Sequence, residues 1–519
     1  MKFNLIFLRC TRRCFQILIM ACFPLFGFSN AKIPKDVEAV LQKAGKNKSE
    51  LLKAINYFQR AGDPLKLQAA YFLISNIDIH YSQDVYWVTP KGKRIMFNEL
   101  AYKDYAASQT ALEALKKKYK IHSKVVVIKD IEVIKGKYLI ENIEQAFTVR
   151  NSTISKDVSF RDFCEYVLPY RVSTEPLSNW RKTYMQRFAF IRQKPTDRGS
   201  KAIATDFFAD FKFWFSNTFG SEVREDFPRL GAFQLLFRKK GPCEDISDLL
   251  GLSLRSQGLP TALDEVTYWA TSSGRHYFNV LFDKSMKPYP IYDASTKIFS
   301  NSPFEREPAK VIRRTFSKQK NVIANFLPSD QIPPGFMRNK NFLDVTDSYW
   351  KVRDLNCGLF RRVEGPPKYV FISTFNTLKW NPTWWAKLKG DSVVFKSMSQ
   401  GAVYLPQYYV AGKLESAGFP IVSGYQRQVV LKPDLKVKRI ITVYPKEKYL
   451  VFRRNSHYIL HYWNKGWVIL QTAFVEDPLI KCLTFKDVPA NCLFLLLPER
   501  SENKERPFTI SSDGTQQWW

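Results

Sequence analysis

The sequence predicts an α+β protein in which helices dominate the first third of the chain and strands dominate the last third. Apolar residues recur at helical spacing between Lys35 and Leu73. After Ile332–Gly335 the pattern changes to short β-branched and aromatic runs separated by Gly, Pro and Asn. With 519 residues, of which 45% are hydrophobic, the chain has a globular composition and is long enough for about three folded units.

Residues 1–31 read as a secretory signal peptide. Four basic residues surround a short apolar start, and the apolar run 15–28 that follows is shorter than the roughly 20 residues of a spanning helix. Small residues precede a predicted cleavage after Ala31, so we expect export to the periplasm, the cell surface or the medium of a bacterium. Alternatively, Ile19–Cys22 resembles a lipobox, and lipidation of Cys22 would be the one route to the membrane.

The chain is strongly basic, with 79 Lys and Arg against 48 Asp and Glu, a formal net charge of +31. Cleavage after Ala31 removes four basic and no acidic residues, which leaves +27. The basic residues are spread over every region and the protein is expected to be exported, so we do not expect nucleic acid as a partner. Anionic polymers of the cell envelope are the partners that this charge favours.

Residues 32–155 form the predicted helical N-terminal region, which includes a helix over 98–120 and a strand over 124–134. Aromatic-rich segments at 156–195 and 207–219 predict helices packed on the unit that follows. We place that unit, the core of the chain, at 156–334.

Two sandwich-like β domains are predicted after the core, at 335–430 and 431–519, because short strands follow one another at close spacing. Three tryptophans of the first domain could stack on sugar rings, but buried aromatics of a sandwich are the favoured interpretation: Trp380, Trp384 and Trp385.

Five cysteines remain after cleavage, an odd number, and a buried free thiol is favoured over a bridge between Cys482 and Cys492. No residue spacing calls for a metal or another cofactor.

Cys243 is the most informative residue. It follows a Gly-Pro turn and begins an amphipathic stretch that Gly258 and Pro260 end, which predicts a helix with the cysteine at its N-terminus. The helix dipole and free amide groups there favour the thiolate, the nucleophilic form, whereas Glu244 and Asp245 oppose it.

A base and a carboxylate follow in order. His276 comes 33 residues later at the start of an apolar strand, and Asp293 lies 17 residues further on a second strand. In this arrangement His276 accepts the proton of Cys243, and Asp293 orients the imidazole and stabilises its charged form. The backbone N–H of Cys243 is the expected oxyanion donor, with Gln234 as a side-chain candidate.

The stretches GPCED…LLGLSLRSQGLPTALDEVTYW, GRHYFNVLFD and PIYDAS resemble the transglutaminase-like superfamily of papain-type folds. FCEYVLPYRVSTEPLSNWR and the C-terminal end of the chain are similar to segments of large exported proteins of Bacteroidetes-type bacteria. The resemblance implies a transglutaminase-like core with a Cys243–His276–Asp293 triad. The chain departs from the family pattern at Phe278, where Trp is usual, and at Ala294, where Pro is common.

Together these features predict a cysteine-dependent amide hydrolase or acyltransferase that works through a thioester. Expected substrates are peptide, glycopeptide or peptidoglycan-type amides, because the superfamily includes peptidases, peptide N-glycanases and transglutaminases. The alternative is an inactive member of the same fold that binds envelope polymer or glycan.

Overall fold

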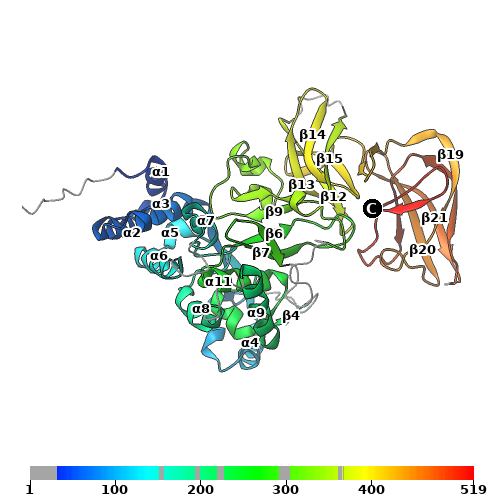
Figure 1. Ribbon diagram of the computed structural model, residues 1–519. Coiled ribbons are helices and arrows are strands. Elements are labelled where there is room, and N and C mark those ends of the chain that lie inside the picture. The colour runs from blue at the N-terminus through cyan, green and yellow to red at the C-terminus, as the bar shows by residue number, and fades with distance from the viewer. Residues whose placement is uncertain are drawn as a thin grey trace, which may run out of the picture.

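The chain is an α+β protein in the computed structural model (Figure 1), which describes residues 32–150, 157–192, 199–218, 227–291, 304–360, 365, 367–477 and 479–519. The predicted signal peptide, its cleavage site and Cys22 lie outside these ranges. Within the part of the chain that the structure describes, none of the helices has the length and apolar character that a membrane crossing needs.

The N-terminal region is a helical layer around one apolar cluster, as the sequence predicts. The helices are α1 Lys35–Lys43, α2 Lys48–Ala61, α3 Pro64–Asn76, α5 Asp130–Val133, α6 Gly136–Arg150 and α7 Phe160–Tyr166. Gly62, with a φ of 66°, ends α2, and the Asp63 side chain caps α3 by accepting from the Lys66 N–H at 3.0 Å.

A three-stranded sheet in the order β2-β1-β3 interrupts this helical region. Its strands are β1 Tyr81–Val88, which the sequence analysis did not predict, β2 Arg94–Ile95 and β3 His122–Lys129. The predicted strand over 124–134 is therefore too long, because its last residues form α5. The predicted helix over 98–120 begins later, as α4 Tyr105–Tyr119, since Asp104 caps it and Asn98 caps a separate short 3₁₀ turn.

The core pairs helix α11 Cys243–Ser256 with a five-stranded antiparallel sheet in the order β10-β9-β6-β7-β8. The strands are β6 Thr261–Val266, β7 His276–Phe282, β8 Pro288–Ile291, β9 Val311–Arg314 and β10 Phe342–Asp344. Around them lie α8 Arg181–Arg187, α9 Gly199–Trp214, α10 Ala232–Arg238, β4 Ser216–Asn217 and β5 Lys240–Gly241. Because β10 pairs with β9, this sheet continues past the predicted boundary at 334.

Two β units follow, at the right of Figure 1. The first contains β11 Val352–Gly358, β12 Tyr369–Asn376, β13 Lys379–Lys387, β14 Ser392–Ser399, β15 Ala402–Val410, β16 Lys413–Ser416, β17 Ile421–Ser423 and β18 Gln428–Val430. The second contains β19 Asp434–Val443, β20 Ser456–Trp463, β21 Trp467–Val475, β22 Leu483–Ala490, β23 Phe494–Pro498, β24 Phe508–Ile510 and β25 Gln516–Trp518. In each unit a two-stranded and a larger sheet share one apolar cluster, which makes a sandwich.

The tryptophans of the first β unit serve packing. Trp384 and Trp385 stack on each other with ring centroids 4.2 Å apart, and Trp380 packs edge-on against Trp463 of the second unit at 5.5 Å. Trp385 is buried, and Trp380 and Trp384 are half-buried against other aromatic rings, in agreement with the interpretation as sandwich aromatics. Cys482 and Cys492 are both free thiols.

Candidate functional site

Cys243 occupies the first position of α11, as predicted. The chain enters through β5, and the Pro242 carbonyl accepts from the Ile246 N–H at 3.1 Å to begin the helix. A Cβ at Gly241 would lie 2.4 Å from the Asp245 carboxylate, so only glycine lets β5 approach the first turn this closely. The Gly-Pro-Cys sequence therefore fixes the thiol at the helix start.

Helix α11 is held against β7 by packing and by one side-chain hydrogen bond. The Asn279 side chain donates to the Ser247 carbonyl at 3.0 Å, and Tyr277 and Leu281 join the apolar cluster that α11 buries. A Cβ at Gly251 would lie 2.8 Å from the Val172 side chain and 3.5 Å from the Asn279 amide nitrogen, so the helix approaches both closely at this position. These contacts fix the position of Cys243 relative to the start of β7.

The thiol of Cys243 is partly buried, and burial raises its pKa above the ordinary value. The main-chain groups of Tyr277 and Glu244 and the charge of Arg229 act in the opposite direction, while the Glu244 carboxylate adds to the rise. The sequence analysis expected the helix terminus to favour the thiolate. Desolvation under β7 outweighs that effect, so a neighbouring base has to remove the proton.

His276 is the first residue of β7 and pairs with Val266 of β6. Its ring stacks on those of Trp269 and Phe278, with centroid distances of 6.2 and 6.0 Å. Side chains alternate along a strand, so Phe278 faces the sheet side opposite to α11, whereas Tyr277 faces the helix. The structure thus brings Cys243 next to the residue that follows His276, and a contact between thiol and imidazole stays a prediction.

The other two predicted site residues contribute differently. Asp293 lies outside the described residues, two positions after the end of β8 at Ile291. Gln234 caps α10: its side-chain oxygen accepts from the Gly231 N–H at 2.7 Å, and its amide donates to Glu99 at 2.6 Å. Because both ends of the Gln234 amide have partners in this cap, the Cys243 N–H remains the better oxyanion donor.

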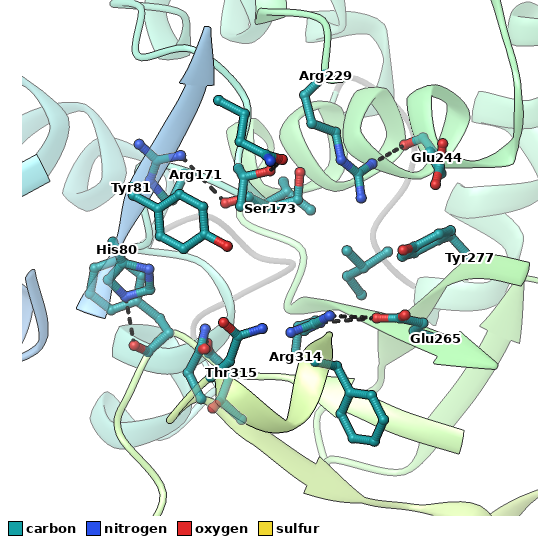
Figure 2. Close-up of a pocket in the computed structure, with 18 of the residues that line it drawn as sticks. His80, Tyr81, Arg171, Ser173, Arg229, Glu244, Glu265, Tyr277, Arg314 and Thr315 are labelled. Carbon is teal, nitrogen blue, oxygen red and sulfur yellow. Dashed lines mark hydrogen bonds and ion pairs between the residues drawn. The ribbon is translucent and has the colours of Figure 1, made fainter. Parts of the chain in front are cut away.

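A cavity of about 570 Å³ opens beside the start of α11 (Figure 2). Glu244 and Tyr277, the residues that follow Cys243 and His276, belong to its wall. Six arginines also line it: Arg171, Arg229, Arg255, Arg275, Arg314 and Arg338. Sequence reasoning missed this set because the arginines come from separate segments and no local pattern connects them.

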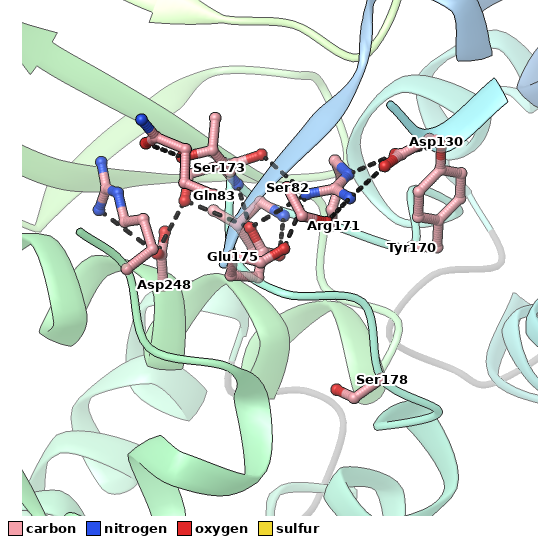
Figure 3. Close-up of polar contacts among 12 residues, drawn as sticks. Ser82, Gln83, Asp130, Tyr170, Arg171, Ser173, Glu175, Ser178 and Asp248 are labelled. Carbon is pink, nitrogen blue, oxygen red and sulfur yellow. Dashed lines mark hydrogen bonds and ion pairs between the residues drawn. The ribbon is translucent and has the colours of Figure 1, made fainter. Parts of the chain in front are cut away.

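Arg171 and Ser173 of the cavity wall belong to a buried polar network (Figure 3). Arg171 donates to both oxygens of Asp130, at 2.7 and 2.6 Å. Ser173 donates to Asp248 of α11 at 2.8 Å, and Asp248 also accepts from Arg229 at 3.3 Å. Glu175 accepts from the Val172 N–H at 2.7 Å. The network therefore joins the N-terminal region to the helix that carries Cys243.

Within the described ranges, no group of three or more His, Cys, Asp and Glu side chains is placed to hold a metal ion. Comparison with known proteins finds no protein family that matches the chain and no curated protein that resembles its sequence.

Proposed function

We propose that the chain is an exported, cysteine-dependent amide hydrolase or acyltransferase with a transglutaminase-like core. The observation that supports this proposal is the position of Cys243, at the start of a buried helix and against the main chain of Tyr277, one residue after His276. A nucleophile at a helix start beside a strand that carries a base is the arrangement that acyl transfer through a thioester requires. Peptide, glycopeptide or peptidoglycan-type amides are the substrates.

In the proposed reaction, His276 accepts the proton of Cys243 and the sulfur attacks the amide carbonyl carbon. The N–H of Cys243, unpartnered within the helix at this position, donates to the oxygen that becomes negative. The C–N bond then breaks and the leaving amine takes the proton from His276, which leaves a thioester. Water, or an acceptor amine, attacks the thioester and restores the thiol. Asp293 would hold the imidazole throughout.

Alkylation of Cys243 by iodoacetamide, followed by mass spectrometry at each cysteine, tests the two central residues. Cys482 is an internal control because, among the described cysteines, it is also free and only partly buried. We expect His276→Ala to slow alkylation of Cys243 at neutral pH by about tenfold, since the buried thiol loses its base, and to leave Cys482 unchanged. Equal rates at Cys243 in both proteins would refute the base assignment.

Product release tests the reaction itself. Peptide, glycopeptide and peptidoglycan fragments are incubated with the wild type and with Cys243→Ala, and new amines or acids are detected by mass spectrometry. We expect products from the wild type alone. Products from both proteins would refute the assignment of Cys243 as the nucleophile.

A second candidate is a binding protein for envelope polymer that keeps the fold without the reaction. Two observations favour it: burial raises the pKa of Cys243, and the ring of His276 stacks on Phe278, on the strand face away from α11. This candidate predicts slow alkylation of Cys243, no effect of His276→Ala, and retention of polymer by Cys243→Ala.

A further inference from the structure

The cavity beside Cys243 has walls from distant parts of the chain. The segment around His80 and Tyr81 closes one end, and Glu244 and Tyr277 close the other (Figure 2). Between them lie the ends of β6 and β9 and a segment that includes Arg338. A volume of about 570 Å³ is in the range of ligand sites, so the cavity can hold a group of several residues or sugar units.

Four of the six lining arginines are bound by the protein itself. Arg171 is paired with Asp130, Arg314 donates two hydrogen bonds to Glu265 at 3.1 and 2.6 Å, and Arg229 reaches Asp248. Arg255 donates to main-chain carbonyls, including that of Thr261 at 3.0 and 2.8 Å. Three of these four arginines therefore pair with carboxylates, whereas Arg255 binds main-chain carbonyl groups.

Arg275 and Arg338 differ from the other four. Among the described residues, no carboxylate lies within ion-pair distance of either guanidinium. Arg275 makes one long hydrogen bond to the Tyr277 hydroxyl at 3.4 Å, and Arg338 uses only its Nε, which donates to the Ile332 carbonyl at 2.9 Å. Both terminal nitrogens of Arg338 and most of the Arg275 fork are thus available at the cavity wall.

The wall beside Arg275 holds both donors and carboxylates. Tyr277, Glu265 and Glu244 raise the pKa of Arg275, and Glu265 is already bound by Arg314. Burial and the Glu265 charge raise the pKa of Tyr277, so its hydroxyl keeps its proton, and Asn339 and Asn341 add side-chain amides. A planar guanidinium with free donors matches a carboxylate in geometry and charge.

We propose that Arg275 and Arg338 bind a carboxylate of the substrate in this cavity, so that the enzyme selects acidic amides, with the reacting bond beside Cys243. This inference rests on the proposed function for the position of the reacting bond. The carboxylate site itself follows from the two arginines that lack acidic partners.

Binding of short peptides to the Cys243→Ala protein tests the site without any catalysis. Dye-labelled triglutamate and triglutamine are compared by fluorescence anisotropy at fixed ionic strength, and a triphosphoserine peptide is the third probe. We expect triglutamate to bind at least about tenfold more tightly than triglutamine. Equal affinities, including no binding of either, would overturn the proposal, and so would binding of the phosphopeptide alone.

Two double variants in the Cys243→Ala background then locate the site. Arg275→Gln with Arg338→Gln should weaken triglutamate binding by about tenfold or more. The control, Arg427→Gln with Arg454→Gln, removes the same charge at exposed positions of the β units and should leave affinity unchanged. Equal weakening in both would show a general charge effect and refute the site. If triglutamate binds as expected while the wild type releases no product from any amide, the proposed function fails and this inference stands.

Discussion

Three arginines that line the same cavity have different surroundings: Arg171 on one hand, and Arg275 and Arg338 on the other. Arg171 is buried and donates to Asp130, to the Ser82 hydroxyl and to the Glu175 carbonyl (Figure 3). Arg275 and Arg338 are exposed to the cavity and make one hydrogen bond each among the described residues. The first arginine therefore holds the structure together, whereas the other two have donors to offer a ligand.

The largest expected effect comes from breaking the Arg171 pair. Asp130→Asn leaves Arg171 as a buried cation whose remaining carboxylate, that of Glu175, lies 3.9 Å away, and removal of one partner of a buried pair costs about 3–5 kcal/mol. Asp130 is fully buried and also accepts from the Tyr170 hydroxyl at 2.9 Å, so water cannot easily replace the charge. The measurement is the free energy of unfolding in urea.

Arg275→Gln is the matched control for that experiment. Its guanidinium has no acidic partner among the described residues, so we expect a change of less than about 0.5 kcal/mol. If the two variants lose similar stability, the distinction between a structural and a ligand-binding arginine fails.

The same distinction explains what the sequence could and could not predict. Helix α11 was predicted at its observed start because Gly-Pro before Cys243 and Gly258 after the helix are local signals. Some of the strands of the β units, among them β12, β15 and β20, were predicted from their own short apolar runs, while β1 was missed because its sequence, YSQDVYWV, is largely half-buried and lacks a clear alternation.

The polar groups around the cavity depend on contacts between distant segments, which no local pattern records. Asp130 and Arg171 are 41 residues apart, and Arg314 meets Glu265 across 49 residues. The pKa of Cys243 follows the same rule, because the helix start is visible in the sequence but the burial under β7 is not.

The next largest effect concerns His80, which lies in the wall of the cavity. Burial lowers the pKa of His80 to about 3, and its ring stacks on Phe316, whose carbonyl accepts from Nε2 at 2.8 Å. Between pH 6.5 and 3 the unfolded chain binds the extra proton and the folded chain does not. Stability therefore falls as the pH drops through this window, by at most about 1.4 kcal/mol per pH unit.

His80→Gln keeps a donor for the Phe316 carbonyl and removes the titration. Urea unfolding at pH 7, 6, 5 and 4 should show a shallower loss of stability on acidification than in the wild type. His122→Gln, at an exposed histidine, is the control and should keep the wild-type slope. An unchanged slope in His80→Gln would contradict the assignment.

Asp248, which accepts from Ser173 and Arg229 of the cavity wall, should show the reverse pH dependence. Burial raises its pKa to about 7, against the opposing charge of Arg229. Between about pH 4 and 7 the folded chain keeps a proton that the unfolded chain releases, so this group makes stability fall as the pH rises. Asp248→Asn should abolish this loss of stability between pH 4 and 7, and we expect the change in slope to be smaller than that of His80→Gln. Asp391→Asn, at an exposed carboxylate, is the control and should keep the wild-type slope. If Asp248→Asn leaves the dependence of stability on pH unchanged, the titrating group is not Asp248.

The smallest expected effect is electrostatic and acts on the thiol directly. The negative charge of Glu244 contributes to the raised pKa of Cys243, so Glu244→Gln should lower that pKa and increase the thiolate fraction at neutral pH. Alkylation of Cys243 should become roughly two- to threefold faster, as expected for one partly exposed charge, while Cys482 in the same molecule reacts at its former rate. A slower reaction at Cys243 would mean that Glu244 supports the nucleophile instead of opposing it. The Glu244 carboxylate would then belong to the proposed catalytic groups.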